Sequence, residues 1–112
     1  MSTNYTAVIE EGKVPNTYMT GEVSYKKQTS EIHPKNTIIK EVTFEPCARS
    51  KWHNNASLHL LIATNGVGFY QEKGGEIRTL HKDEVVTILP GVEHWYGATP
   101  LSKFSYIAII TE

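Results

Sequence analysis

The stretch LHLLIATNGVGFYQEKGG, residues 58–75, decides the fold class that this sequence favours. Residues 58–64 are typical of a strand whose side chains alternate between two faces, one of which carries His59. The Asn-Gly pair at 65–66 predicts a hairpin to the next run, since both residues tolerate the positive φ of a tight turn. The Gly-Gly pair at 74–75 predicts a second hairpin, which leads into the run EIRTL.

Short β-type runs lie on both sides of this stretch, and no window carries the apolar period of a core helix. The runs are TIIKEVTF at 37–44, VVTILP at 85–90 and KFSYIAII at 103–110. Several short strands at a spacing of about ten residues predict an all-β sandwich or barrel. Residues 26–37 are rich in Lys, Ser, Thr and Pro, a composition that predicts a loop. We interpret residues 1–16 as an arm or an edge segment.

Length and charge narrow the class of protein further. The chain has 112 residues, which predicts a single domain. Lys plus Arg number 11 and Asp plus Glu number 12, so the net charge of −1 gives no basic footprint for nucleic acid or for an anionic membrane. Cys47 is the single cysteine, which excludes an intramolecular disulfide. The first residues lack a basic and apolar leader, so we expect a cytoplasmic protein with no membrane partner.

Three of the five histidines, His53, His59 and His94, form a candidate metal site. The spacing between His53 and His59 does not suit one face of a helix, but it suits a loop that folds back onto a strand. A later strand could then bring His94 to the same point inside a barrel. Neutral imidazole binds zinc, copper, iron and nickel well. The alternative is that two of these histidines are exposed in loops and the third is half-buried in a strand.

Residues 46–75, PCARSKWHNNASLHLLIATNGVGFYQEKGG, and residues 85–100, VVTILPGVEHWYGATP, resemble the two motifs of the cupin superfamily, with the family spacing kept. The closer likeness is to small single-domain bacterial cupins similar to those found near carboxymuconolactone decarboxylases, a group that includes manganese-dependent hydroxynitrile lyases. The first motif has Gly, His, His, Glu and Gly at positions that here hold Cys47, His53, Asn55, His59 and Gly66. The second has Gly, Pro, Gly, His and Asn at positions that here hold Asp83, Leu89, Gly91, His94 and Ala98.

This resemblance implies an antiparallel double-stranded β-helix, the jelly-roll barrel of the cupins, often assembled as a homodimer. Residues 37–112 would form the conserved barrel, and residues 1–36 an N-terminal arm with edge strands. It also implies a divalent metal ion inside the barrel, with manganese, iron, zinc and nickel as candidates. The ligand positions of the family carry over to His53, Asn55, His59 and His94.

The departures from the family pattern change the expected ligand set. Asn55 replaces a histidine and His59 replaces a glutamate or glutamine, so three imidazoles remain and Asn55 could add a weak amide oxygen. Tyr96 and Tyr106 stand where the closer group has histidines on the inner wall. They are candidate catalytic groups that would hydrogen-bond an anionic substrate or act as general acids. The alternative is that both tyrosines are wall residues with satisfied hydroxyls.

Two functions follow from this pattern. The first is a metal-dependent enzyme that acts on a small organic molecule inside the barrel, by lyase, decarboxylase or oxygenase chemistry. The second is a non-catalytic cupin that binds a small ligand, as a sensor for example, with a degenerate metal site. The loss of the family histidine at Asn55 motivates the second.

Overall fold

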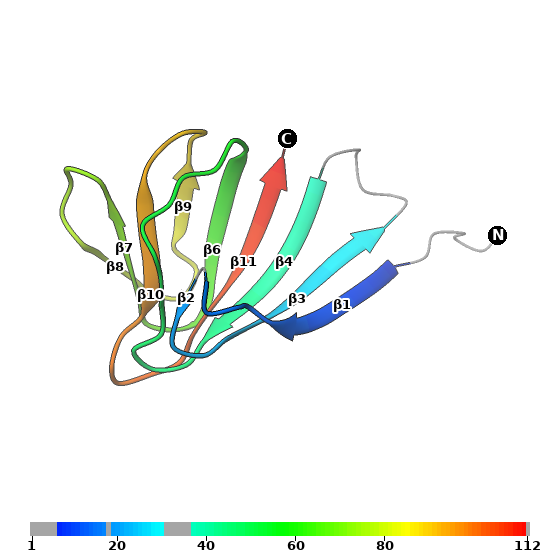
Figure 1. Cartoon of the computed structure of the whole chain (residues 1–112), viewed down its shortest axis with the longest axis horizontal. Helices are drawn as coiled ribbons and strands as arrows, with labels where there is room; N and C mark the ends of the chain where they lie inside the picture. The colour runs from blue at the N-terminus through cyan, green and yellow to red at the C-terminus, as the bar shows by residue number, and fades with distance from the viewer. Residues whose placement is uncertain (1–6, 18, 31–36, 112) are drawn as a thin grey trace.

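The computed structural model describes residues 7–17, 19–30 and 37–111, and within them every regular element is a strand. None of the described residues forms a helix able to cross a membrane. The strands form two antiparallel sheets (Figure 1), so the predicted all-β jelly roll is confirmed. One sheet has the order β1 (Ala7–Lys13), β3 (Val23–Ser30), β4 (Thr37–Phe44), β11 (Phe104–Thr111), β6 (Leu58–Gly66), β9 (Val85–Ile88). The other has the order β2 (Met19–Thr20), β5 (Arg49–Ser50), β10 (His94–Ala98), β7 (Gly68–Glu72), β8 (Arg78–Leu80).

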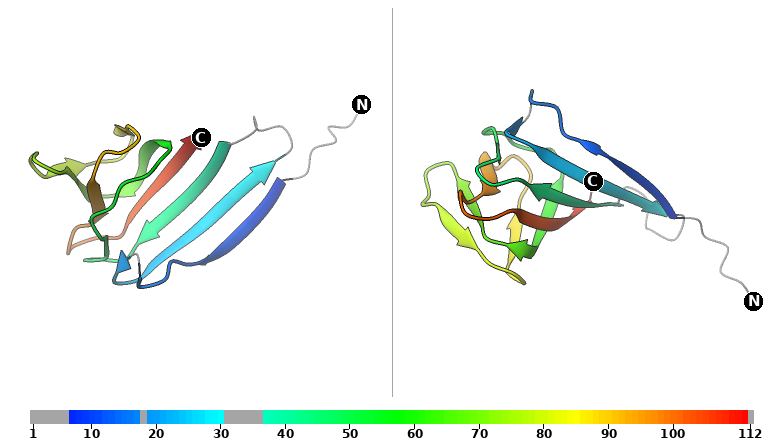
Figure 2. Two further views of the ribbon diagram at one scale, coloured as in Figure 1. Left: turned by 45° about the horizontal axis from the view of Figure 1, so that its top comes forward. Right: turned by 90° about the horizontal axis from the view of Figure 1, so that it is seen from below.

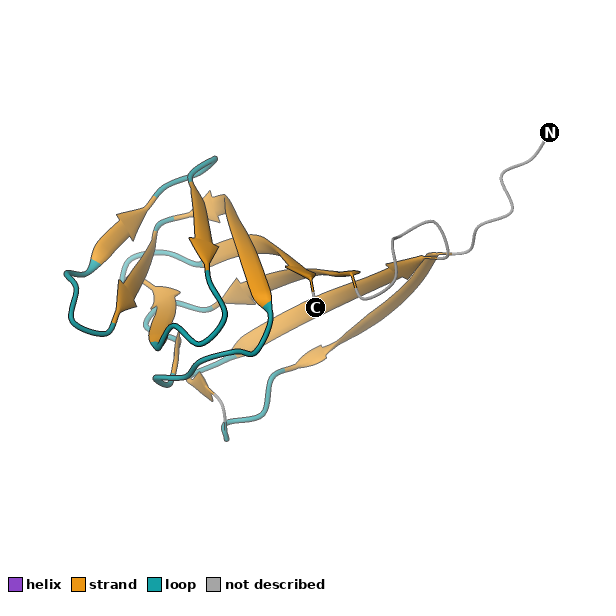
Figure 3. Cartoon of the chain, turned by 90° about the horizontal axis from the view of Figure 1, so that it is seen from above, coloured by secondary structure: helices purple, strands orange, loops and turns teal. Residues whose placement is uncertain are grey.

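The two sheets enclose the core, and the six-stranded sheet reaches beyond it. Figure 2 shows β1 and β3 as a long ribbon that leads away from the barrel, and Figure 3 shows the same ribbon from above. Along β11 alternate residues are buried, namely Phe104, Tyr106, Ala108 and Ile110. This alternation agrees with the sequence pattern and fixes which face of the six-stranded sheet lines the interior.

The hairpin predicted at residues 65–66 is wrong. β6 and β7 belong to different sheets, so the chain crosses from one sheet to the other at this point. Gly66 has a φ of 73°, and a Cβ placed on it would overlap the carbonyl oxygen of Lys103. The Asn-Gly pair therefore serves a close crossing of two backbone segments instead of a hairpin. The hairpin predicted at 74–75 is confirmed, because β7 pairs antiparallel with β8.

The loop predicted over residues 26–37 is also wrong for its first part. Residues 26–30 belong to β3, which pairs with β1 on one side and with β4 on the other. Pairing on both edges outweighs the weak strand propensity of Lys, Gln and Ser in this segment. Residues 31–36 lie outside the described residues, as do residues 1–6 of the predicted arm.

Two turns hold a residue with a side chain in a conformation that favours glycine. Cys47 has a φ of 69° and Asp83 a φ of 74°, and both stand where the cupin motifs have glycine. Each is the third residue of a four-residue turn. The turns are closed by the hydrogen bonds Ala48 N to Glu45 O, 2.9 Å, and Glu84 N to His81 O, 3.0 Å.

We expect Cys47→Gly to raise the free energy of unfolding by about 0.5–1 kcal/mol. A Cβ in the left-handed region costs about 1–2 kcal/mol, and glycine removes this cost. The greater conformational entropy of glycine in the unfolded chain offsets part of the gain. Denaturant unfolding of both proteins measures the difference. Cys47→Ala keeps the Cβ and is the matched control, with no comparable gain. Equal stabilisation by alanine would show that the thiol, and not the backbone, is unfavourable at this position.

Candidate metal centre

The backbones of His53 and His94 bind each other directly. The His53 amide donates to the carbonyl oxygen of His94 at 3.0 Å, and the His94 amide donates to that of His53 at 2.9 Å. His53 lies in the loop between β5 and β6, and His94 is the first residue of β10. The centroids of their two rings are 4.3 Å apart. The structure therefore brings together two imidazoles that lie far apart in the sequence.

Both rings are oriented so that the same nitrogen is free. Nδ1 of His53 is 2.8 Å from the carbonyl oxygen of Lys51, and Nδ1 of His94 is 2.8 Å from that of Val92. A carbonyl oxygen only accepts, so each Nδ1 carries a proton, and in a neutral imidazole this leaves the lone pair on Nε2. Nε2 of His94 is buried and has no hydrogen-bond partner among the described residues. Fixing Nδ1 on a carbonyl and leaving Nε2 free is the arrangement that a metal-binding histidine needs.

Asn55 follows on the same loop, and the nitrogen of its side-chain amide is also buried without a partner among the described residues. The side-chain Nδ2 makes no hydrogen bond with any described residue, whereas the backbone carbonyl oxygen of Asn55 accepts from the Gly91 amide at 2.8 Å. The two ends of an amide are assigned from their partners, so either its oxygen or its nitrogen can occupy this buried position. The donor set of buried imidazole and amide groups fits a divalent ion.

His59 reaches the same region from β6, on the other sheet. It is half-buried, and its backbone pairs with Ile88 and Ile110. Burial lowers the pKa of His59, and the charges of His94, Lys40 and His53 lower it further. Among the described residues, however, no three His, Cys, Asp or Glu side chains are grouped closely enough to hold a metal ion. The structure thus brings His53 and His94 together and leaves His59 farther from this pair.

Tyr96 and Tyr106 connect the histidine pair with the interior. The ring of Tyr96 lies 5.5 Å from that of His94 and 5.4 Å from that of Tyr106, between centroids. Burial raises the pKa of both phenols, and that of Tyr106 is raised further by Tyr96. Both side chains are therefore neutral hydrogen-bond donors near pH 7, and neither is a base.

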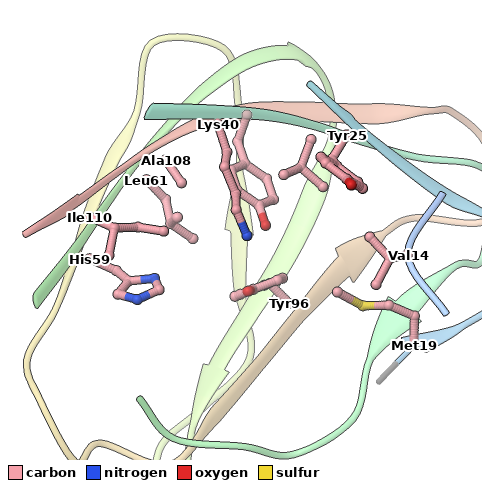
Figure 4. A pocket seen from close by; sticks show the side chains of 11 residues that line it. Val14, Met19, Tyr25, Lys40, His59, Leu61, Tyr96, Ala108 and Ile110 are labelled. Carbon is pink, nitrogen blue, oxygen red and sulfur yellow. The ribbon is translucent and has the colours of Figure 1, made fainter. Parts of the chain in front are cut away.

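A cavity of about 140 Å³ lies between these groups. Figure 4 shows His59, Tyr96 and Lys40 pointing into it, with Val14 and Met19 at the opposite side. A second cavity, of about 340 Å³, is lined by His53, Asn55 and Trp52 and shares Met19 with the first. The two cavities flank the metal-site candidates from the barrel interior and from the loop side.

Tyr70 and Lys40 were not predicted from the sequence. The Tyr70 ring lies 5.8 Å from that of His94, and its hydroxyl donates to the Glu72 carboxylate at 2.8 Å. Burial raises the pKa of Tyr70, and this hydrogen bond raises it further. Only the pairing of β7 with β10, which sets Tyr70 opposite Tyr96, places it at the site.

In metal-free protein we expect the free energy of unfolding to fall as the pH drops from about 6.5 to 5. Burial lowers the pKa of both His94 and His59 in the folded state, so the unfolded state binds more protons in this range. Urea unfolding at several pH values measures the slope. His94→Gln removes one of the two groups and reduces the slope, whereas His81→Gln, at an exposed position, is the control. A slope unchanged in His94→Gln would contradict a buried neutral His94.

Comparisons with known proteins place this architecture in a family. No protein-family model matches the chain. The (R)-mandelonitrile lyase of Granulicella tundricola is 37% identical over 98 residues, which are 88% of this chain and 75% of that protein. The crystal structure of a cupin-like protein from Thermotoga maritima shares 40% identity with a TM-score of 0.81, over 91% of this chain and 78% of that chain. A predicted oxalate decarboxylase from Thermotoga maritima shares the fold at 17% identity, with a TM-score of 0.80 over 92% of both chains. With this identity, coverage and fold, the chain belongs to the cupin superfamily, among the small bacterial cupins.

Proposed function

We propose that this cupin is a metal-dependent lyase for a small organic molecule, with a divalent ion held by His53, His59 and His94. The observation that carries the proposal is the buried Nε2 of His94, which has no partner among the described residues. It lies beside a second imidazole, that of His53, whose Nδ1 also contacts a backbone carbonyl oxygen. A buried acceptor left without a partner costs about 1–3 kcal/mol, and a bound cation would remove this cost. Asn55 would supply an amide oxygen as the fourth ligand.

The lyase class is supported by the relative named a mandelonitrile lyase. A bound divalent ion would polarise a substrate oxygen and stabilise negative charge on it. Tyr96 and Tyr106 would hold their protons and donate hydrogen bonds to the anion that forms, since burial raises the pKa of both. The apolar walls of the cavity would keep water from that anion.

All the proposed ligands are neutral, so the ion would keep its full charge. Manganese, iron, zinc and nickel all suit imidazole and amide donors, and metal availability decides among them as much as affinity does. A homodimer, a cytoplasmic location and a small-molecule substrate without nucleic-acid or membrane partners complete the proposal.

The second candidate is a non-catalytic cupin that binds a small ligand. The absence of a group of three ionisable ligands among the described residues favours it, as does Asn55 in a position where the family has histidine. Such a module would bind its ligand without turnover.

We expect the purified protein to hold close to one metal ion per chain after incubation with manganese, iron, nickel or zinc. His94→Ala and His53→Ala should both lose it, because each removes an Nε2 ligand. His81→Ala, which alters an exposed histidine in a turn, is the matched control and should keep it. Plasma mass spectrometry measures the content, and circular dichroism checks folding. Full metal content in both site variants would refute the assignment.

Tyr96→Phe should lower kcat for (R)-mandelonitrile cleavage by roughly 100-fold, the usual scale for removing one donor that stabilises a developing anion. Metal content should not change, because the phenol is not a proposed ligand. The appearance of benzaldehyde measures the rate, and the uncatalysed reaction is subtracted. Metal-loaded wild type without turnover, but with stabilisation by a bound small molecule, would favour the binding module.

A further inference from the structure

A lysine lies on the inner face of the six-stranded sheet, where a barrel wall ordinarily has apolar residues. Lys40 shares its face of β4 with the buried Val42 and Phe44, two and four residues further along the strand. On the neighbouring strand β3, Lys27 lies directly opposite Lys40. On β11, the neighbour at the other edge of β4, Ala108 lies opposite Lys40. Two lysines therefore lie side by side on one row of the sheet, an arrangement that like-charge repulsion disfavours.

The residues that the structure describes do not balance the charge on this row. Glu10, on the edge strand β1, lies opposite Lys27, so one carboxylate accompanies two ammonium groups. Three other lysines, Lys13, Lys73 and Lys103, each lie within 4 Å of a glutamate. Lys40 has no hydrogen bond or ion pair with any described residue.

The Lys40 ammonium points into the cavity. Figure 4 shows its side chain extending from β4, with the nitrogen on the side of Tyr96. The described residues that line this cavity include three tyrosines and His59, and no aspartate or glutamate. The remaining lining is apolar, with Leu61 and Ile110 near His59 and with Met19 across the cavity.

We propose that the substrate or ligand of this cavity is a small organic carboxylate, whose anionic group pairs with the Lys40 ammonium while its apolar part lies against Leu61, Ile110 and Met19. The inference rests on the proposed function, because it names the substrate class of the same cavity. A cavity that binds a carboxylate would differ from that of an enzyme whose substrates are all neutral. Of the proposed metal ligands, His59 lines this cavity.

The physical reason is the unfavourable environment of an ammonium group that has no partner in the described part of the chain. Burial lowers the pKa of Lys40, and the charge of Lys27 lowers it further, whereas Glu10 raises it. A carboxylate in the cavity would give Lys40 the partner that no described residue supplies. Hydrogen bonds between two charged groups are shorter and about twice as strong as neutral ones. The hydroxyl of Tyr96 adds a neutral donor for an anion, and no carboxylate among the described residues of the cavity lining repels it.

The test measures binding of matched acid and amide pairs to the metal-incubated protein by calorimetry. The probes are mandelate with mandelamide, and the smaller lactate with lactamide. Wild type should bind at least one acid roughly 10- to 100-fold more tightly than its amide, the scale of a hydrogen bond between charged groups. Lys40→Met should remove this preference, and Lys40→Arg should largely restore it. Lys26→Met is the control, since Lys26 lies one residue from Lys27 and therefore on the opposite face.

The outcomes separate this inference from the metal proposal. Loss of the acid preference in Lys40→Met, with metal content unchanged, supports it, even if wild type proves to hold no metal. If the preference survives in Lys40→Met and disappears in His94→Ala, the carboxylate binds the metal and the inference is overturned. Equal binding of acid and amide to wild type, or no binding of either pair at millimolar concentration, also overturns it.

Discussion

The reciprocal hydrogen bonds between His53 and His94 are the constraint on which the rest of the site depends. They join the loop after β5 to the start of β10, so neither ring can move without the other. The carbonyl oxygens that hold the two Nδ1 atoms belong to residues two positions earlier in each segment, Lys51 and Val92. The backbone contact therefore sets the separation of the two imidazoles, and the carbonyl oxygens of Lys51 and Val92 orient the rings.

The sequence predicts the strands much better than it predicts their partners. Alternation identifies β6 and β11, because a half-buried strand must alternate, and short runs of β-branched and apolar residues identify β4 and β9. It does not identify the sheet to which a strand belongs. The Asn-Gly pair at 65–66 permits a positive φ. Both a tight hairpin and a close passage beside the Lys103 carbonyl require such a φ, so the pair does not distinguish them. Residues 26–30 become a strand because two neighbours pair with them, which no local window can reveal.

The candidate site shows the same division. The convergence of His53 and His94 follows from a loop that folds back near a later strand, and the sequence contains both parts. Tyr70 and Lys40 reach the site through strand register, and a shift by one residue would turn either side chain to the opposite face. Likewise, Cys47 and Asp83 depart from the glycines of the family motifs, yet the backbone keeps the glycine-type conformation at both. In these two turns the surrounding fold imposes the positive φ, and a residue with a Cβ adopts it.

The order of the strands in the sheets also has a consequence for how the protein folds. β4 pairs with β11, and β5 with β10, so the central contacts join segments from distant parts of the chain. Topologies dominated by such pairings fold slowly, since a long loop must close before the contacts form. The two imidazoles meet only after β10 has joined β5 and β7. During synthesis the N-terminal half of the chain contains His53 but not His94, so the pair of imidazoles cannot yet form. A metal ion can therefore bind to both imidazoles only after the barrel has formed.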